Sequence, residues 1–337
     1  MFDLNIIYIL GIVFLISLVL NKILIQYSHI LKLVDKPNNR SMHRVEKSRA
    51  GGLAIFLAFS LGLLISDISI NIYIILSFFV IFLLGLYDDR FSSSSKTKIF
   101  WIIIASIFLA LGHMYISDLG VFLGKEVGLP SWLAIIFTTF ALVGFINAVN
   151  LIDGIDGLCA GVSIVILIAY SYLGFKYNDQ FLFYIASFLI ISLLGFLWFN
   201  WNPSKIFMGD SGSLTLGFVI AVLSIHSVEK DYITPSTVLL LTAVPILDTL
   251  VVMLRRIRNG QNPFKADKTH IHHIILKQHY QNVSKTAKLL ILLQAVFTYI
   301  GLGFKVRDDL IILTIFIMLF ILFYALLTPK KNKLKQC

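Results

Sequence analysis

The stretch Asn147-Ala-Val-Asn-Leu-Ile-Asp-Gly-Ile-Asp-Gly157 lies between two long apolar runs. It places two amides, Asn147 and Asn150, and two carboxylates, Asp153 and Asp156, where a membrane helix should end. Placing such groups in the hydrocarbon of a membrane costs free energy, so they usually mark a functional site. Because no Lys or Arg stands among them, we interpret them as groups that await a cation or a phosphate. A plain polar connector between two spans is the simpler alternative.

The composition is that of a membrane protein. The chain has 337 residues, 58% of them hydrophobic, and a mean hydropathy of +0.88. A soluble domain is rarely this apolar, so we expect an all-α, polytopic membrane protein. Two cysteines, Cys159 and Cys337, provide no disulfide framework. The first apolar run lacks a basic n-region and a small-residue cleavage site, which indicates a retained span.

Eleven apolar runs are long enough, or nearly so, to predict transmembrane helices. They cover residues 4–25, 52–65, 70–87, 99–116, 129–149, 158–176, 181–199, 213–226, 235–254, 288–304 and 310–328. The second and the eighth are short, and we expect each to borrow flanking residues.

The distribution of basic residues predicts the orientation. With the C-terminus in the cytosol, 21 of the 28 Lys and Arg residues fall in internal segments, 5 in external ones and 2 within span ends. This bias follows the positive-inside rule. We therefore expect an external N-terminus, a cytosolic C-terminus with a basic tail at 329–337, and a site on the cytosolic face, where the polar loops gather.

Further acids fall at two places. Asp88 and Asp89 end the third predicted span, and we interpret them as a metal contact or a general base; solvated helix-end acids are the alternative. Asp248 lies inside the ninth predicted span, where an acid usually faces a cavity or a partner. A salt bridge to Arg255 or Arg256 is the structural alternative for Asp248.

The segment Phe207-Met-Gly-Asp-Ser-Gly-Ser213 precedes the eighth predicted span. Glycines and hydroxyls at a helix N-terminus suit an anion, and Asp210 could hold a divalent ion against that anion. Helix capping by Asp210, Ser211 or Ser213 is the simpler interpretation. Phe207 is either an interfacial anchor or a platform for a base.

A basic loop runs from Arg255-Arg256 to His270-Ile-His272-His273. Clustered Arg, Lys and His side chains suit phosphate oxygens. The three histidines could instead bind zinc, but no cysteine or further helical histidine completes a tetrahedral set, so a pyrophosphate is favoured. A positive-inside anchor with chance histidines is the remaining alternative.

Four motifs in this order resemble those of the polyprenyl-phosphate N-acetylhexosamine-1-phosphate transferases, glycosyltransferase family 4. The matching motifs are Asp88-Asp89, residues 147–157, residues 207–213, and Pro263-Phe264 through His273. The resemblance covers residues 35–273. The His-Ile-His-His form is similar to the WecA/TagO branch, the undecaprenyl-phosphate GlcNAc-1-phosphate transferases.

The resemblance implies transfer of an N-acetylhexosamine 1-phosphate, usually GlcNAc-1-phosphate, from a UDP-sugar to undecaprenyl phosphate, with release of UMP. It implies Mg²⁺, with Mn²⁺ as a substitute, held by Asn150 and Asp210. One integral-membrane domain, residues 1–337, would act in the bacterial cytoplasmic (inner) membrane; the last two spans lie at 288–328. The expected partners are the two substrates and the lipid bilayer, with no nucleic acid, and a homodimer is compatible with the resemblance.

The expected site residues fall into two further groups. Asp88 and Asp89 match acids that handle the lipid phosphate, and Asp153 and Asp156 match a second acidic pair for catalysis and nucleotide placement. The residues expected to bind substrate are Lys98, Asn147, Phe207, Asp248, Arg255, Arg256, His270, His272 and His273. Ser41 stands where the family often has Lys, which leaves the role of that loop open.

Two alternatives stay open. A transporter or flippase of an anionic or lipid-linked solute is the competing class, and polar residues at the membrane midplane would favour it. Here the acids gather at one face, which favours an enzyme. Another UDP-N-acetylamino sugar could replace UDP-GlcNAc, and the downstream glycan, such as O-antigen or teichoic acid, is not set by the sequence.

Overall fold

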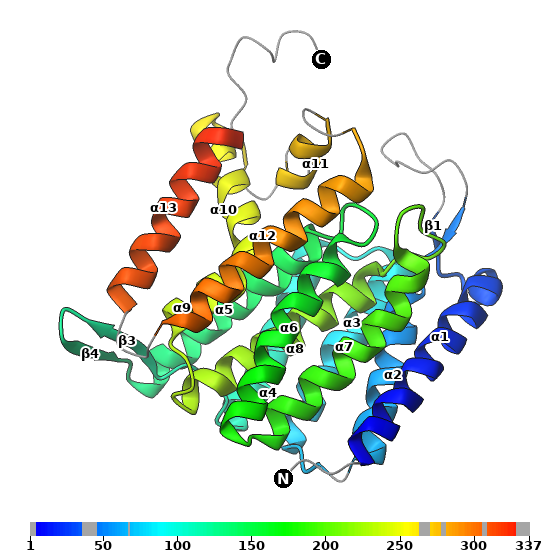
Figure 1. Cartoon of the computed structure of the whole chain (residues 1–337), viewed down its shortest axis with the longest axis horizontal. Coiled ribbons are helices and arrows are strands. Elements are labelled where there is room, and N and C mark those ends of the chain that lie inside the picture. Colours follow the sequence, from blue (N-terminus) through cyan, green and yellow to red (C-terminus); the bar gives the residue numbers. More distant parts are fainter. Residues whose placement is uncertain are drawn as a thin grey trace.

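The structure is a computed structural model that describes residues 5–35, 46–66, 68–262, 270–277, 281–304 and 309–327. Ser41, the Pro263-Phe264 pair and the basic tail at 329–337 lie outside the described residues. Long helices make up most of the molecule, and two short β-ladders join them (Figure 1).

Among the described residues the helices are α1 (Asn5–Leu31), α2 (Gly51–Ile65), α3 (Ile72–Phe91), α4 (Ser95–Leu111), α5 (Ser131–Leu151), α6 (Leu158–Tyr177), α7 (Gln180–Asn200), α8 (Gly209–Glu229), α9 (Pro235–Leu241), α10 (Ala243–Arg258), α11 (Ile271–Ile275), α12 (Val283–Gly303) and α13 (Asp309–Leu327). The strands are β1 (Val34–Asp35), β2 (Lys47–Ser48), β3 (Asp118–Phe122) and β4 (Lys125–Gly128). Each ladder is an antiparallel pair, β1 with β2 and β3 with β4.

The prediction of a helical, polytopic membrane protein is confirmed. Eight helices in the described part of the chain are long and apolar enough to cross a membrane: α1, α3, α5, α6, α7, α8, α12 and α13. Two more predicted spans correspond to shorter helices, α2 with 15 residues and α4 with 17. The ninth predicted span is not one continuous helix, because α9 and α10 meet at a bend of 89°.

Helix α8 lies at the centre of the bundle, and 94% of its apolar stretch is buried. Helices α2, α3, α5 and α6 pack around it (Figure 1). Small residues allow the backbones to meet at its N-terminus. A Cβ on Gly85 of α3 would lie 2.5 Å from Ser211 Cα, and one on Gly52 of α2 would lie 2.1 Å from the nitrogen of Gly212. The first turn of α8 is therefore fixed between α2 and α3.

The two ladders mark opposite ends of the bundle (Figure 1). At one end, Ser48 of β2 forms a parallel bridge with Ile206, which ties the chain before α8 to the segment before α2. At the other end, Val121 of β3 donates its backbone N–H to Asp309 Oδ2 at 2.8 Å and thereby docks the β3–β4 hairpin on α13.

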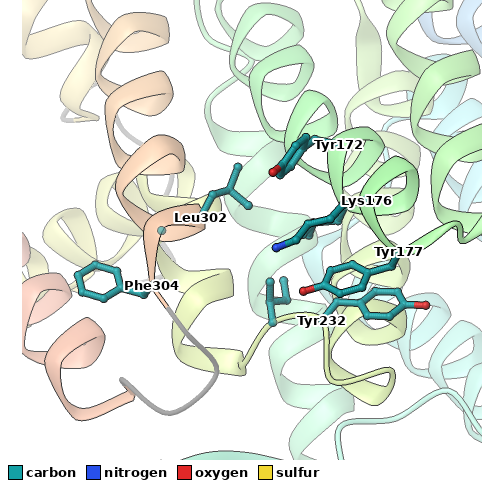
Figure 2. Close-up of a pocket in the computed structure, with 9 residues that line it drawn as sticks. Tyr172, Lys176, Tyr177, Tyr232, Leu302 and Phe304 are labelled. Carbon is teal, nitrogen blue, oxygen red and sulfur yellow. The ribbon is translucent and has the colours of Figure 1, made fainter.

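A cavity of about 210 Å³ lies at this second end, where α6 and α12 finish. Tyr172, Lys176 and Tyr177 of α6 point toward Leu302 of α12 across it (Figure 2). Lys176 Nζ lies 5.0 Å from the centroid of the Tyr177 ring. Tyrosine and lysine side chains at the end of a span are usual anchors in the membrane interface, and this end fits that role.

The bend between α9 and α10 is supported by Gln294 of α12. Gln294 Nε2 donates to the carbonyl of Leu241 at 2.7 Å, and its Oε1 accepts from the N–H of Val244 at 2.9 Å. Gln294 is fully buried. Because backbone groups within a membrane must find partners inside the protein, this amide is what permits a sharp break at that depth.

Replacing Gln294 with leucine should lower the free energy of unfolding by about 1–3 kcal/mol, since two buried backbone groups lose their partners at similar side-chain volume. The midpoint of thermal unfolding in detergent measures this. Gln26→Leu, on an exposed part of α1, is the matched control and should leave the midpoint unchanged. Equal midpoints for both variants would contradict the role of Gln294.

Candidate active site

Four predicted site residues meet at the N-terminus of α8. Lys98 of α4 donates to Asp210 of α8, and its Nζ lies 3.0 Å from Oδ2 of Asp88 at the end of α3. Asn150, near the end of α5, donates through Nδ2 to Asp210 Oδ1 at 3.2 Å and to Ser213 Oγ at 2.8 Å. We call Asp88, Lys98, Asn150 and Asp210 the Asp210 cluster. Its members come from four different helices.

The serine run that follows α3 shapes this cluster. Ser93 donates to Asp88 Oδ1 from its backbone nitrogen at 2.6 Å and from its hydroxyl at 2.5 Å. Ser94 caps α4 by accepting from the N–H of Thr97 at 3.2 Å. The chain therefore turns at Ser93 and enters α4 so that Lys98 returns to Asp88.

Asp89 faces the backbone of α8. Its Oδ1 accepts from the N–H of Asp210 at 2.7 Å and its Oδ2 from the N–H of Ser211 at 2.9 Å. A carboxylate at this place satisfies amides that have no partner within the helix and is favoured by the helix dipole. Gly209 has a φ of +71°, and a Cβ there would lie 2.7 Å from both Asp89 oxygens. Asp89 was predicted to be catalytic, and in the structure it caps α8, a role that the sequence offered as an alternative for Asp210, Ser211 or Ser213.

Asp153 lies close to the Asp210 cluster. Removal from water raises the pKa of its carboxyl to about 7, and the negative charges of Asp210 and Asp89 act in the same direction. Its backbone N–H donates to the carbonyl of Asn150 at 3.3 Å. The central stretch therefore turns back on itself and brings a third carboxylate toward Asp210.

Asp156 has a different surrounding. Its carboxylate accepts from Asn202 Nδ2 at 3.0 Å, and from the nitrogen and hydroxyl of Ser204 at 3.0 and 2.8 Å. Asn200, which is buried, accepts from the N–H of Gly157 at 3.0 Å and donates to the carbonyl of Ile206 at 2.8 Å. Asp156 and Asn200 thus fasten the central stretch to the loop between α7 and α8. No motif recognised in the sequence predicts this use of Asn200.

Phe207 lies at the edge of the same loop and is partly exposed. Lys47 Nζ is 4.9 Å from the centroid of its ring and donates to Ser204 Oγ at 2.9 Å. From the sequence, Lys47 was only one of the internal basic residues that indicate the orientation. The structure places it beside the residue predicted to stack on a base.

A second cluster joins α10 to α11. Asp248, 1% exposed, accepts from His270 Nδ1 at 3.1 Å and from the N–H of Ile271 at 2.7 Å, and His272 Nδ1 lies 3.7 Å from it. We call Asp248, His270 and His272 the histidine cluster. The carboxylate of Asp248 is therefore paired with this segment and not with Arg255 or Arg256, the structural alternative considered for it.

The histidine cluster touches the central stretch at Gly154. A Cβ on Gly154 would lie 2.2 Å from His272 Nε2, so only glycine lets the ring lie there. His272 is 1% exposed, and its Nε2 has no hydrogen-bond partner within the described ranges. The centroid of the His273 ring is 4.2 Å from that of His272. The central stretch, residues 147–157, and the histidine motif are therefore in contact, although more than a hundred residues separate them in the sequence.

Asn147 and Arg255, also predicted to bind substrate, donate to backbone carbonyls. Asn147 Nδ2 donates to the carbonyl of Val143 in its own helix at 2.7 Å. Arg255 donates through Nη1 to the carbonyl of Leu327 at the end of α13 at 3.0 Å, and Arg256 is buried on the same helix. The bond of Arg255 joins α10 to the end of α13, whereas that of Asn147 stays within α5.

The donors at Asn150 and Asp210 fit a hard cation. Mg²⁺ is usually held by one or two carboxylates together with phosphate oxygens and waters. Rotating the Asn150 amide would turn its oxygen toward Asp210, so that one cation could contact both side chains. Within the described residues, no three His, Cys, Asp or Glu side chains form a metal site. Zinc at the three histidines, the alternative weighed from the sequence, therefore gains no support.

Comparison with known proteins identifies the family. The model of glycosyl transferase family 4 matches residues 71–228. A probable undecaprenyl-phosphate N-acetylglucosaminyl 1-phosphate transferase of Bacillus subtilis is 37% identical over 249 residues, which cover 72% of this chain and 69% of that protein. The undecaprenyl-phosphate alpha-N-acetylglucosaminyl 1-phosphate transferase of Yersinia pestis is 30% identical over 305 residues, 86% of this chain and 83% of that protein.

The corresponding transferase of Escherichia coli (strain K12) is 31% identical over 273 residues, 78% of this chain and 74% of that protein. The chain belongs to glycosyl transferase family 4, on the WecA/TagO-like branch that these relatives represent. The resemblance inferred from the four motifs is confirmed.

Asp89→Asn should lower the thermal midpoint by the equivalent of about 1–2 kcal/mol, because asparagine offers one neutral acceptor oxygen to two N–H groups of α8. Asp88→Asn is the adjacent control, and its partners Ser93 and Lys98 are side-chain and loop groups that can rearrange. We expect less than half the loss there. Equal losses in the two variants would mean that Asp89 does not hold the start of α8.

Asp153 should make stability depend on pH in metal-free buffer. Its folded pKa of about 7 exceeds the ordinary value of 3.8. The folded state therefore binds this proton more tightly than the unfolded chain, and stability falls as pH rises from about 4 to 7. Asp153→Asn should raise the thermal midpoint at pH 8 and change it little at pH 4. The same change at both pH values would contradict this account.

Proposed function

We propose that this protein transfers N-acetylglucosamine 1-phosphate from UDP-GlcNAc to undecaprenyl phosphate and releases UMP, the step that starts a lipid-linked envelope glycan. The Asp210 cluster is the observation that carries the proposal, because it gathers acids, an amide and an ammonium at the ends of apolar helices in a chain of this family. The names of the relatives agree with it. The transporter alternative is not favoured, since these acids sit at helix ends.

The proposed setting is the bacterial inner membrane, with eleven spans counted as ten helices and the bent α9–α10 pair. The cytosolic face would be the end of the bundle that carries α11 and β1, opposite the β3–β4 hairpin (Figure 1). The excess of Lys and Arg in the segments at that end supports this orientation. The lipid phosphate would then meet the site at the level of the headgroups.

The proposed chemistry is a displacement at phosphorus. An oxygen of the lipid phosphate forms a bond to the β-phosphorus of the UDP-sugar, and the bond from that phosphorus to the bridging oxygen breaks, so that UMP leaves with the electron pair. Both reactants are anions, and their repulsion must be offset by fixed positive charge. Lys98 supplies such a charge between Asp88 and Asp210.

Asp88 is the acid best placed to accept a proton from the lipid phosphate, because Asp89 is occupied by the amides of α8. When Mg²⁺ is bound, it would stabilise charge on the diphosphate, and Asn150 and Asp210 are the residues that would hold it. Lys47 and Phe207, at the rim of the same site, are placed to receive the nucleotide.

Purified protein with Mg²⁺, undecaprenyl phosphate and UDP-GlcNAc should release UMP, and chelation should stop the release until Mg²⁺ or Mn²⁺ is restored. Asp210→Asn should lower the rate at least about 100-fold, the usual scale for losing a group that stabilises charge in the transition state. Asp231→Asn, in an exposed turn after α8, is the control and should retain the rate. Absence of UMP release with every UDP-N-acetylhexosamine tested would overturn the proposal.

The orientation can be tested with single cysteines in a chain in which Cys159 and Cys337 are replaced by alanine. A membrane-impermeant maleimide should label Asn178→Cys, between α6 and α7, in intact cells. Ser95→Cys, at the start of α4, should be labelled only after the membrane is opened. The reverse pattern would place the Asp210 cluster on the external face.

A further inference from the structure

The carboxylate of Asp248 has no part in the chemistry proposed above, yet it is buried and surrounded by groups of one segment, residues 270–272. Three groups share its two oxygens: the N–H of Ile271 on Oδ1, and the Nδ1 atoms of His270 and His272 on the side of Oδ2. Taking a carboxylate out of water is costly unless such partners repay it. We therefore expect Asp248 to fix the conformation of residues 270–272.

The contacts of Asp248 fix both a backbone and two rings. Ile271 is the first residue of α11 and His270 precedes it, so the bond to the Ile271 N–H sets where this short helix begins. A carboxylate only accepts hydrogen bonds, so the ring nitrogen that faces it carries a proton. The Nε2 atoms of His270 and His272 then remain available for hydrogen bonds to other groups.

The Nε2 atom of His272 lies in an unusual position for a polar atom. Its Nε2 is buried against Gly154 and has no hydrogen-bond partner in the part of the chain that the structure describes. A buried polar atom without a partner is costly, and proteins rarely keep one without a use. Gly154 belongs to the turn that carries Asp153, beside the Asp210 cluster. A substrate bound beside Gly154 could therefore supply the hydrogen-bond partner that Nε2 of His272 lacks.

We propose that Asp248 is a positioning residue, which holds His270 and His272 by Nδ1 so that Nε2 of His272 meets an anionic oxygen of the substrate beside Gly154. The proposal rests on the function proposed above, which supplies a diphosphate. With a phosphate oxygen beyond Nε2 and the Asp248 carboxylate 3.7 Å from Nδ1, the ring of His272 can donate to the phosphate while Asp248 keeps the ring in place. Asp248, expected from the sequence to bind substrate, acts through the histidines.

Asp248→Asn tests this role with a readout that is independent of turnover. The asparagine NH₂ would face a histidine Nδ1 and require that atom to accept, so the proton would leave Nδ1. In protein labelled with ¹⁵N-histidine, the Nδ1 signal of His270 or His272, assigned with His270→Gln and His272→Gln, should move from the protonated to the unprotonated range. The kcat/KM for UDP-GlcNAc should fall about 10- to 100-fold, the usual scale for losing a group that orients a ligand-binding histidine.

Asp179→Asn is the matched control at the far end of the bundle. Asp179 likewise accepts from a histidine, His226 Nε2 at 2.7 Å, and from a backbone N–H, that of Leu182 at 2.9 Å, and it also accepts from the hydroxyl of Tyr232. Loss of this pair should leave kcat/KM within about twofold of the wild type. A comparable fall in both variants would show that Asp248 contributes only stability, and would overturn the proposal.

Gly154→Ala provides a second variant, should Asp248→Asn not fold. Its Cβ would displace the His272 ring without touching Asp248, so kcat/KM should fall while the Nδ1 signal of His270 stays in the protonated range. Unchanged kcat/KM in Gly154→Ala or in Asp248→Asn, or unchanged Nδ1 signals in Asp248→Asn, would overturn the positioning role. An inactive wild type would instead count against the proposed function, and the ¹⁵N signals would then decide on Asp248 alone.

Discussion

The carboxylate of Asp89 reaches from the end of α3 to the first amides of α8, and this contact sets the position of Asp210. Helix α8 is almost wholly buried, so its first turn cannot be capped by water. A neighbouring helix must supply the acceptor. The close backbone contacts at Gly85 and Gly52 are a consequence, because α3 and α2 must approach α8 closely for this bond to form. The geometry of the site follows from one buried helix end.

Charge balance explains the rest of the arrangement. Asp88, Asp153 and Asp210 would repel one another in surroundings from which water is largely removed, and the ammonium of Lys98 offsets part of that repulsion. The same excess of negative charge is the kind of surrounding that a divalent cation would offset. The histidine cluster, built on α10 and α11, contributes groups that suit phosphate and touches the acids through Gly154. The two clusters thus place groups that suit a cation beside groups that suit a phosphate.

Much of this could be predicted from the sequence, because the membrane limits the choices. Apolar runs and the bias of basic residues predict the helices, and acids at the ends of such runs predict a site. The bend at α9–α10 could not be predicted, since its support comes from Gln294, which lies some fifty positions away in the chain. The sequence also could not distinguish Asp89 from Asp88 or Asp156 from Asp153. Their different roles depend on which hydrogen-bond donors surround each carboxylate, and the sequence does not show those donors.

In the proposed reaction a sugar phosphate moves from a nucleotide to a lipid at the Asp210 cluster. The most direct measurement follows the β-phosphorus itself, with UDP-GlcNAc labelled by ³²P at that position and undecaprenyl phosphate in detergent micelles. The account predicts that the label passes into the organic phase with the lipid while the released UMP is unlabelled. Label that remains in the aqueous phase, or that appears in UMP or free phosphate, would contradict it.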